Sequence, residues 1–262
     1  NPFRDPRNID NIVAKRGALF MVNLKYEVMK RGFTVVHIKT DSIKIADATP
    51  EIIKFVMDYG RLYGYTFEHE ATYDRICLVN NAVYIAKFAT VDKCMALYGY
   101  APGENIEDRG EWTATGAQFQ VPYVFKTLFS KEEITFDDMC ETKTVTKGDI
   151  CLDCNEGMGD NHNYVFVGRV GQFCPVIPGS GSGELICHNG DKYSAVTGTK
   201  GYRWMESEVV RQLHLEDTID KSYYNKLVDD ALAAINEYCD AEWFCSDAEY
   251  DHEFGIPGQV PF

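Results

Sequence analysis

A β-branched segment directly after a long helical pattern is the feature that most constrains the fold of this chain. Apolar residues recur at helical spacing through residues 8–31, and Gly32 supplies a helix stop. Residues 33–38 are apolar and largely β-branched, which favours a strand, and residues 43–45 favour a second strand. Only the short polar segment 39–42 separates the two, so we expect a helix followed by an antiparallel hairpin.

The next segment predicts another helix and more strands. Thr49 and Pro50 indicate a helix start, and Gly64 a helix end. The apolar residues expected on the buried face of this helix are Ile52, Phe55, Val56, Tyr59 and Leu62. Three further strands are expected at residues 65–70, 75–79 and 83–88. We therefore predict an α+β fold, in which the hairpin and these strands form one antiparallel sheet backed by the two helices.

The remainder of the chain is expected to form two further parts. Short helices are predicted at 121–129 and 136–140, β-type residues dominate 163–200, and longer helices are predicted at 206–213 and 222–243. The expected domain ranges are 1–98 for the sheet domain, 99–150 for a helical segment, and 151–262 for a β-rich part closed by a helix.

Charge is distributed unevenly along the chain. The 262 residues carry 26 Lys and Arg and 40 Asp and Glu, a net charge of −14. Residues 1–100 nevertheless carry 14 basic and 11 acidic side chains, a net charge of +3, whereas 227–262 carry nine acids and no Lys or Arg. Non-specific nucleic-acid binding by the whole surface is therefore not expected, but a basic cleft within the first hundred residues is compatible with these charges.

Targeting signals are not expected in this sequence. The apolar stretch 17–24 is far shorter than the roughly 20 residues that cross a bilayer. The N-terminus has no apolar signal region and no initiator Met, which predicts a fragment or processed product. Nine scattered cysteines, an odd number, favour free thiols in a reducing cytoplasm.

The hairpin carries the most informative candidate residue. Asp41 falls in the turn between the two strands, so its carboxylate is expected to project from a rigid support. Mg²⁺ prefers such oxygen ligands and usually keeps waters or substrate phosphates in its other positions. An Asp in a tight turn is also a common turn residue without further function, and the spacing alone leaves both interpretations open.

Three segments in order resemble the family B DNA polymerases. Residues 37–42 (His-Ile-Lys-Thr-Asp-Ser) resemble motif C, usually Tyr-Gly-Asp-Thr-Asp-Ser. Residues 67–70 with Tyr73 resemble the family's Leu-Glu-Phe-Glu-Lys-x-Tyr strand, and residues 80–84 occupy the place of its Lys-Lys-Arg-Tyr motif. The segments 112–116 and 199–204 also look like polymerases of tailed phages or their prophages.

The resemblance implies template-directed nucleotidyl transfer with Mg²⁺ or Mn²⁺, acting on a DNA primer–template and a dNTP. Asp41 would be the metal ligand and catalytic acid, and Glu70 an auxiliary acid. Thr40 and Ser42 would shape the turn and, with Lys39, contact DNA. Tyr84 would support the primer strand. The expected parts are the palm and the thumb, and the expected location is the bacterial host cytoplasm.

Departures from the family pattern predict an incomplete enzyme. Lys39 replaces the first acid of motif C, and Asn81 and Ala82 replace both primer-gripping lysines, so Lys87 is expected to contact the DNA backbone instead. No match to motif A or motif B precedes Asp41. We therefore expect no polymerisation by this chain alone, and expect an N-terminal remainder of the polymerase as partner.

Two other interpretations stay open. A degenerate remnant could bind primer–template without chemistry, or the hairpin resemblance could be accidental in an unrelated interaction module. A second candidate DNA contact is the turn 198–203, where Lys200, Tyr202 and Arg203 combine two cations with an aromatic ring. The alternative for this turn is a simple reversal before a helix.

Overall fold

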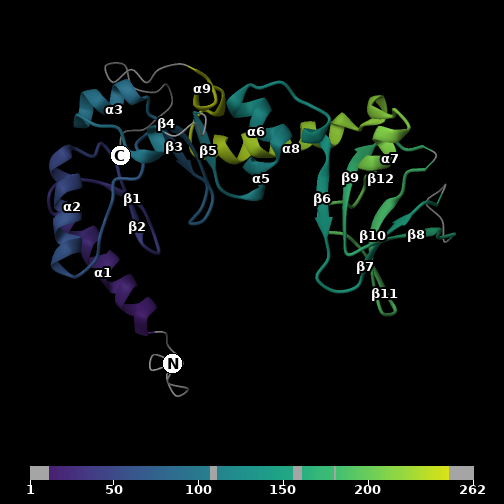
Figure 1. The fold of residues 1–262 in the computed structure, drawn as a ribbon, viewed down its shortest axis with the longest axis horizontal. Coiled ribbons are helices and arrows are strands. Elements are labelled where there is room, and N and C mark those ends of the chain that lie inside the picture. The colour runs from purple at the N-terminus through teal and green to yellow at the C-terminus, as the bar shows by residue number, and fades with distance from the viewer. Residues whose placement is uncertain (1–11, 107–110, 156–160, 180, 248–262) are drawn as a thin grey trace. The chain divides into compact units, whose positions relative to one another are not determined.

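The computed structural model describes residues 12–106, 111–155, 161–179 and 181–247. Its helices and antiparallel sheets confirm the α+β class (Figure 1). Contacts divide the chain into two compact units, one ending at Gly116 and the other beginning at Ala117. The domain ranges expected from the sequence have their boundaries after residues 98 and 150 instead.

The N-terminal unit begins with the predicted helix and hairpin. Its elements are α1 (Ile12–Met29), β1 (Val35–Lys39), β2 (Ser42–Ile45), α2 (Pro50–Leu62), β3 (Tyr73–Leu78), β4 (Tyr84–Phe88), α3 (Val91–Tyr98), α4 (Gly103–Ile106) and β5 (Trp112–Ala114). Thr49 occupies the N-cap of α2 with Pro50 in its first turn, and Gly32 and Gly64 adopt positive φ just after the two long helices. The helix and hairpin predictions are thus confirmed, with small shifts at the C-terminal ends of the helices, and residues 8–11 of the first predicted helix lie outside the described residues.

The core of this unit lies between α1, α2 and the hairpin (Figure 1). Its buried side chains are Phe20, Met21, Leu24 and Val28 from α1 and Ile52 and Val56 from α2. Ile38 and Ile43 of the hairpin pack against them. The predicted core position Leu62 is wrong, because this side chain at the last turn of α2 is 76% exposed.

Two sequence-based expectations for the strands are also wrong. Residues 65–70 form no strand but a connection between α2 and β3. The hairpin and the later strands do not share one sheet: β1 and β2 form a two-stranded sheet, and β3, β4 and β5 form a separate three-stranded one. The backbone hydrogen bonds of β4 are shared between β3 and β5, so the sheet gains a strand from residues 112–114 instead.

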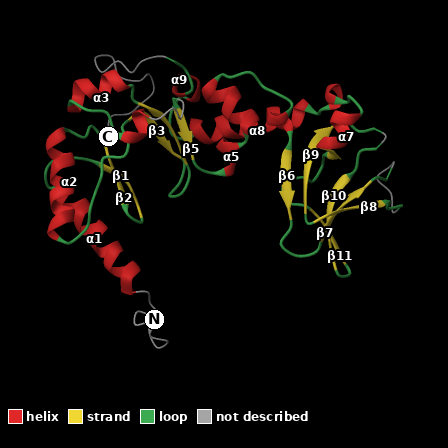
Figure 2. Cartoon of the chain, viewed as in Figure 1, coloured by secondary structure: helices red, strands yellow, loops and turns green. Residues whose placement is uncertain are grey.

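The C-terminal unit is built on two antiparallel sheets, with helices at one side and at one end of them (Figure 2). Its helical elements are α5 (Ala117–Gln120), α6 (Pro122–Phe125), a π-helical turn (Lys126–Ser130), two 3₁₀ turns (Asp137–Met139 and Glu216–Thr218), α7 (Ser207–Gln212), α8 (Lys221–Asn236) and α9 (Ala241–Phe244). Its strands are β6 (Glu141–Thr144), β7 (Asp149–Asp153), β8 (Tyr164–Gly168), β9 (Val170–Val176), β10 (Glu184–Asn189), β11 (Lys192–Ala195) and β12 (Arg203–Glu206). The strand orders are β11-β10-β7-β8 and β12-β9-β6.

Large aromatic side chains fill the core of this unit. Trp204 and Tyr224 are fully buried, and the Trp204 indole N–H donates to the Thr199 carbonyl oxygen at 3.2 Å. Tyr123 stacks on Tyr224 with ring centroids 4.7 Å apart, which joins α6 to α8. The predicted helix 206–213 is confirmed, whereas the predicted helix 222–243 is split into α8 and α9.

None of the helices in the described residues is both long and apolar enough to span a membrane.

Candidate functional site

The hairpin presents Asp41 at an exposed tip. Lys39 pairs with Ser42, so Thr40 and Asp41 form a two-residue turn. Thr40 has φ +44°, a left-handed conformation that a β-branched residue adopts only at a cost in free energy. The Ser42 hydroxyl donates to the Lys39 carbonyl oxygen at 3.2 Å and so helps to close the turn. The predicted turn-shaping residues therefore lie where the sequence placed them, beside Asp41.

Two contacts dock this hairpin on the β3–β4 region. His37 Nε2 lies 3.1 Å from the Asn81 carbonyl oxygen in the β3–β4 turn. On β2, the Lys44 ammonium lies 5.5 Å from the ring centroid of Tyr73 and 5.1 Å from that of Tyr84. Cations attract the faces of aromatic rings at such distances, more strongly where water is excluded. The two separate sheets are thereby joined through side chains.

Lys44 also brings the auxiliary acid into the site. Burial lowers the pKa of the Lys44 ammonium, while the nearby carboxylates of Glu70 and Glu104 oppose this by favouring its charged form. Glu70 lies in the irregular connection after α2, where its carbonyl oxygen accepts a hydrogen bond from the Glu104 amide at 3.1 Å. The structure thus groups Glu70 and Tyr84, both predicted, around a lysine.

Three members of this cluster were not predicted from the sequence to act together. Tyr73 faces Tyr84, and burial together with that neighbour raises the pKa of its phenol. Lys44 could have been suspected from the sequence, because it is the one charge between two isoleucines in a short strand. No sequence signal marks Glu104, since its approach depends on the backbone contact with Glu70.

The candidate DNA contacts on β4 point in opposite directions. Side chains alternate along a strand, and Tyr84 and Lys87 are three residues apart, so they lie on opposite faces of the sheet. Lys87 lies 3.4 Å from a carboxylate oxygen of Glu111 and 5.7 Å from the ring centroid of Trp112. This geometry therefore does not support contact of both Tyr84 and Lys87 with a DNA strand on one face of the sheet.

The turn 198–203 belongs to the C-terminal unit, and its three candidate DNA contacts lie in different surroundings. Lys200 is exposed. Tyr202 is partly buried and packs edge-on against Tyr223, with ring centroids 4.9 Å apart. Arg203 donates to Asn155 Oδ1 at 3.0 Å, to the Asn155 carbonyl at 2.9 Å and to the Ser182 carbonyl at 2.6 Å. Of the three, Lys200 is the one whose position suits contact with a phosphate backbone.

The described residues do not bring together a ligand set for a divalent cation at the hairpin tip. Asp41 is the one acid of the hairpin tip, and exposed Lys39 stands where a second acid would be needed. Within residues 12–106, 111–155, 161–179 and 181–247, no group of three or more His, Cys, Asp or Glu side chains is arranged to hold a metal ion. A Mg²⁺ site at Asp41 would therefore need ligands from outside the described residues.

Comparisons with known proteins identified no relative of this chain. No protein-family model, no curated protein and no solved structure matches the chain.

Proposed function

We propose that this chain is the C-terminal palm and thumb part of a family B-like DNA polymerase. It takes part in template-directed DNA synthesis, in a bacterial host cytoplasm, together with a polypeptide segment that supplies the missing acids. The observation that carries this proposal is the hairpin tip, where a strained Thr40 holds Asp41 in solvent on a hairpin anchored by His37 and Lys44. Backbone strain of this kind is concentrated at functional sites.

The residues have separate roles in this proposal. Asp41 supplies one carboxylate of a Mg²⁺ or Mn²⁺ site that the companion segment completes, where the cation would assist transfer of a nucleotide from a dNTP to the primer. Tyr84 presents its ring to the primer strand, and Lys44 holds that ring in place beside the hairpin. Lys39 and Lys200, both exposed, contact phosphates by charge.

A second candidate function is primer–template binding without chemistry. Lys39 favours it, because a cation beside Asp41 attracts a phosphate and weakens the affinity of the turn for a divalent cation. In that case the hairpin grips DNA but never joins a nucleotide to it.

Primer extension separates the two candidates. The test uses the longest natural polypeptide that contains these residues, with Mg²⁺ and dNTPs. We expect extension by the parent and a roughly thousandfold lower rate for Asp41→Asn, because metal-ion catalysis supplies several kcal/mol. Asp47→Asn is the matched control: Asp47 is exposed, lies in the next turn and also has positive φ, so its rate should equal that of the parent.

Three results would decide against the leading proposal. Undiminished extension by Asp41→Asn would exclude Asp41 as a metal ligand. Absence of extension by a folded parent that still binds primer–template would favour the second candidate. Failure of the folded parent to do either would exclude both.

A further inference from the structure

Helix α1 carries two apolar faces, and only one of them packs inside the N-terminal unit. Phe20, Met21, Leu24 and Val28 are buried against α2 and the hairpin. A second set recurs at alternating spacings of three and four residues and stays in solvent. With one interruption at Lys15, this set consists of Ile12, Leu19, Val22, Tyr26 and Met29.

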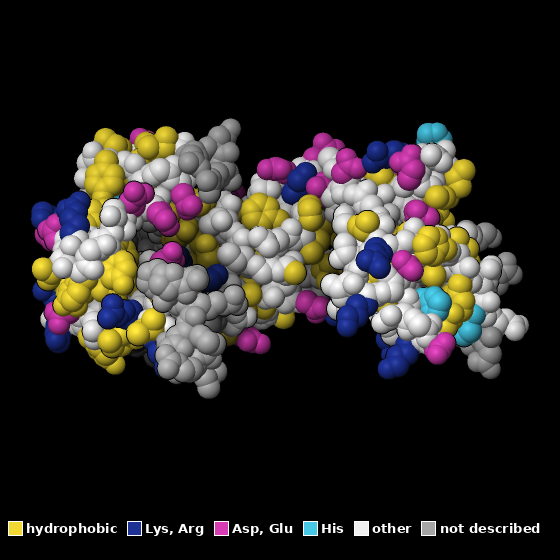
Figure 3. Space-filling model, turned by 60° about the horizontal axis from the view of Figure 1, so that its bottom comes forward, with side chains coloured by type: hydrophobic (Ala, Val, Ile, Leu, Met, Phe, Trp, Pro, Cys, Tyr) yellow, Lys and Arg dark blue, Asp and Glu magenta, His cyan; other side chains and the backbone are white. Residues whose placement is uncertain are grey.

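The exposed set, called here the α1 stripe, is unusual in its extent. Its five apolar side chains are between 44% and 61% exposed, although single exposed apolar residues are ordinary on protein surfaces. Figure 3 shows hydrophobic side chains interspersed with Lys and Arg on the N-terminal unit, at the left of the view. A row of exposed apolar side chains along one face of a helix favours an interaction site.

The spacing of the stripe specifies a helix as its partner. If Ile12 is position a of a heptad, Leu19 and Tyr26 also occupy a positions. Val22 and Met29 occupy the second and third d positions, and Lys15 the first. Such a narrow a/d seam is the contact surface of helices packed in a coiled-coil manner. At 1.5 Å rise per residue, the 18 residues of α1 would take a partner helix of similar length, about three heptads.

The residues that flank the stripe specify the charge of that partner. The e and g positions beside an a/d seam form ion pairs between packed helices. On α1 and its last turn these positions hold Arg16, Lys25 and Lys30 together with Ala18 and Asn23, and no acid. Glu27, the one acid of the helix, lies outside the seam, where it pairs with Lys30 at 2.6 Å and Arg31 at 3.1 Å. Glu27 can neutralise only one of these cations, so the flanks of the stripe keep a net positive charge.

The same charges oppose a second copy of this chain as partner. Two α1 helices packed through the stripe would bring cations against cations, whether parallel or antiparallel, and like charges in this arrangement are destabilising. Anionic lipid headgroups would also attract these cations, and the vesicle measurement below distinguishes a membrane surface from a partner helix.

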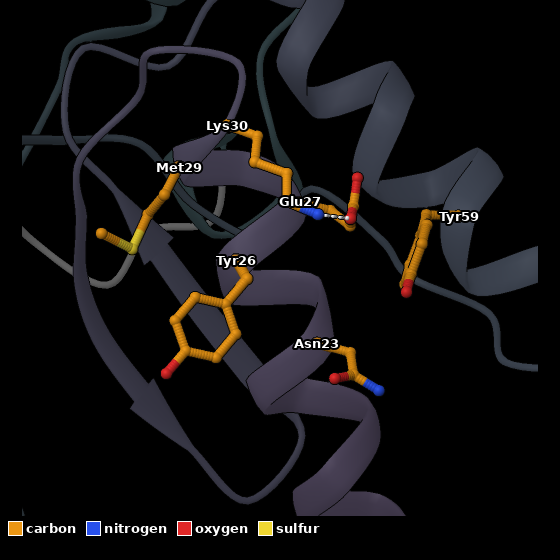
Figure 4. A pocket seen from close by; sticks show the side chains of 6 residues that line it. All are labelled: Asn23, Tyr26, Glu27, Met29, Lys30 and Tyr59. Atoms are coloured by element: carbon orange, nitrogen blue, oxygen red, sulfur yellow. Dashed lines mark hydrogen bonds and ion pairs between the residues drawn. The ribbon is translucent and has the colours of Figure 1, made fainter.

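Space for partner side chains is present at the C-terminal end of the stripe. A hollow of about 530 Å³ is lined there by Asn23, Tyr26, Glu27, Met29, Lys30 and Tyr59. In Figure 4 Tyr26 and Met29 project from α1 on the side away from Tyr59 of α2, so the two stripe residues are not covered by α2.

We propose that the α1 stripe docks an amphipathic helix with acidic flanks, contributed by a different polypeptide. Apolar side chains of the partner would fill the seam, and its Glu or Asp side chains would pair with Arg16, Lys25 and Lys30. This proposal rests on α1 alone and does not depend on any role of the hairpin.

A designed peptide tests the proposal directly on the whole chain. The probe has three heptads with Ile at a, Leu at d and Glu at e and g, and the control peptide has Lys at e and g. By fluorescence anisotropy we expect the acidic peptide to bind at least tenfold more tightly than the basic one, and its affinity to fall with added salt. Leu19→Ser combined with Tyr26→Ser should weaken binding about tenfold or more, whereas Leu62→Ser, an exposed Leu of α2 outside the stripe, should not.

A charge exchange gives an independent measurement if the double serine variant fails to fold. Arg16→Glu combined with Lys30→Glu changes exposed side chains only and should shift the preference toward the basic peptide. Equal binding of both peptides, or of neither, would overturn the proposal. So would binding to anionic phosphatidylglycerol vesicles without peptide binding, or a dimer in sedimentation that Leu19→Ser with Tyr26→Ser dissociates.

Discussion

At the residue scale, two buried carboxylates of the C-terminal unit are held by hydrogen bonds from nearby loops. Asp153 is 2% exposed and accepts from His162 Nδ1 at 2.6 Å and from the Asn163 amide at 2.9 Å. Asp138 accepts from the Thr135 amide at 2.6 Å and from Lys126 at 3.0 Å. Burying a carboxylate is costly unless it is satisfied in this way, so each acid fixes the loop that satisfies it.

The Asp153 carboxylate predicts a pH dependence of stability. Burial alone would raise its pKa, but the hydrogen bonds from Asn163 and His162 outweigh burial and hold the pKa below its usual value. A lowered pKa in the folded state stabilises the protein above the ordinary Asp pKa of about 3.9, and this stabilisation is lost as the pH falls through the folded-state value. Asp153→Asn should lower the free energy of unfolding at pH 7 by about 1–3 kcal/mol.

Urea unfolding at several pH values checks this prediction. The difference between parent and Asp153→Asn should shrink as the pH falls below about 4. Asp191→Asn, an exposed acid in the β10–β11 turn, should show little difference at any pH. A gap between parent and Asp153→Asn that stays constant with pH would mean that the charge of Asp153 contributes nothing.

Glycine 148 predicts a second effect at this scale. It has φ +77°, and an added Cβ would overlap the carbonyl oxygen of His188. Gly148→Ala should therefore lower the free energy of unfolding by at least about 2 kcal/mol. Gly17→Ala, where a Cβ inside α1 meets nothing within 4 Å, should instead raise it by about 0.5–1 kcal/mol. Thermal unfolding of both variants tests the pair, and equal effects would contradict it.

At the scale of elements, side chains rather than backbone hydrogen bonds connect the sheets and loops. The hairpin meets the β3–β4 region through His37 and Lys44. In the C-terminal unit, Arg203 at the start of β12 joins the loop after β7 to the loop before β10 through Asn155 and Ser182. Because β7 and β10 belong to one sheet and β12 to the other, these hydrogen bonds connect the two sheets of this unit.

Arg203 is therefore expected to act on stability rather than on DNA binding. Arg203→Ala should lower the free energy of unfolding by about 2–4 kcal/mol, because it leaves several partly buried acceptors without this donor. Arg203→Lys should recover only part of this, since an ammonium cannot reproduce the planar donor arrangement. Lys200→Ala should leave stability unchanged and weaken binding to a fluorescent primer–template at low salt. The reverse pattern would assign Arg203 to the DNA contact.

At the scale of the whole molecule, each unit has its own hydrophobic core. Leu24 is fully buried in the N-terminal unit, and Leu185 is 1% exposed in the C-terminal unit. The two clusters have no residue in common. A chain with separate cores need not unfold as one cooperative system.

Two unfolding transitions are expected in scanning calorimetry. Leu24→Ala should destabilise one of them by about 2–5 kcal/mol and leave the other unchanged, because the cavity is confined to one core. Leu185→Ala should affect the other transition by a similar amount. A single transition that both variants shift equally would show that the units unfold together.

The local elements around the candidate site were predictable because their signals are short-range. The stop at Gly32, the β-branched run after it and the cap at Thr49 each act within a few residues. The strand predicted at 65–70 failed because its residues found no partner strand, which no local pattern reports. Leu62 was misplaced for a similar reason, since helical periodicity does not show that the core ends before the last turn of α2.

By itself the sequence determined the α+β class, the helix–hairpin–helix order and the position of Asp41 in a turn. Only the tertiary structure decided that Lys44 is grouped with Tyr73 and Tyr84, that Arg203 is committed to Asn155 and Ser182, and that one apolar face of α1 stays in solvent. These partners lie far apart in sequence, and the free energy of their contacts depends on which surfaces the folded chain brings together. Local spacing fixes the elements, whereas burial and long-range contact fix what their side chains can do.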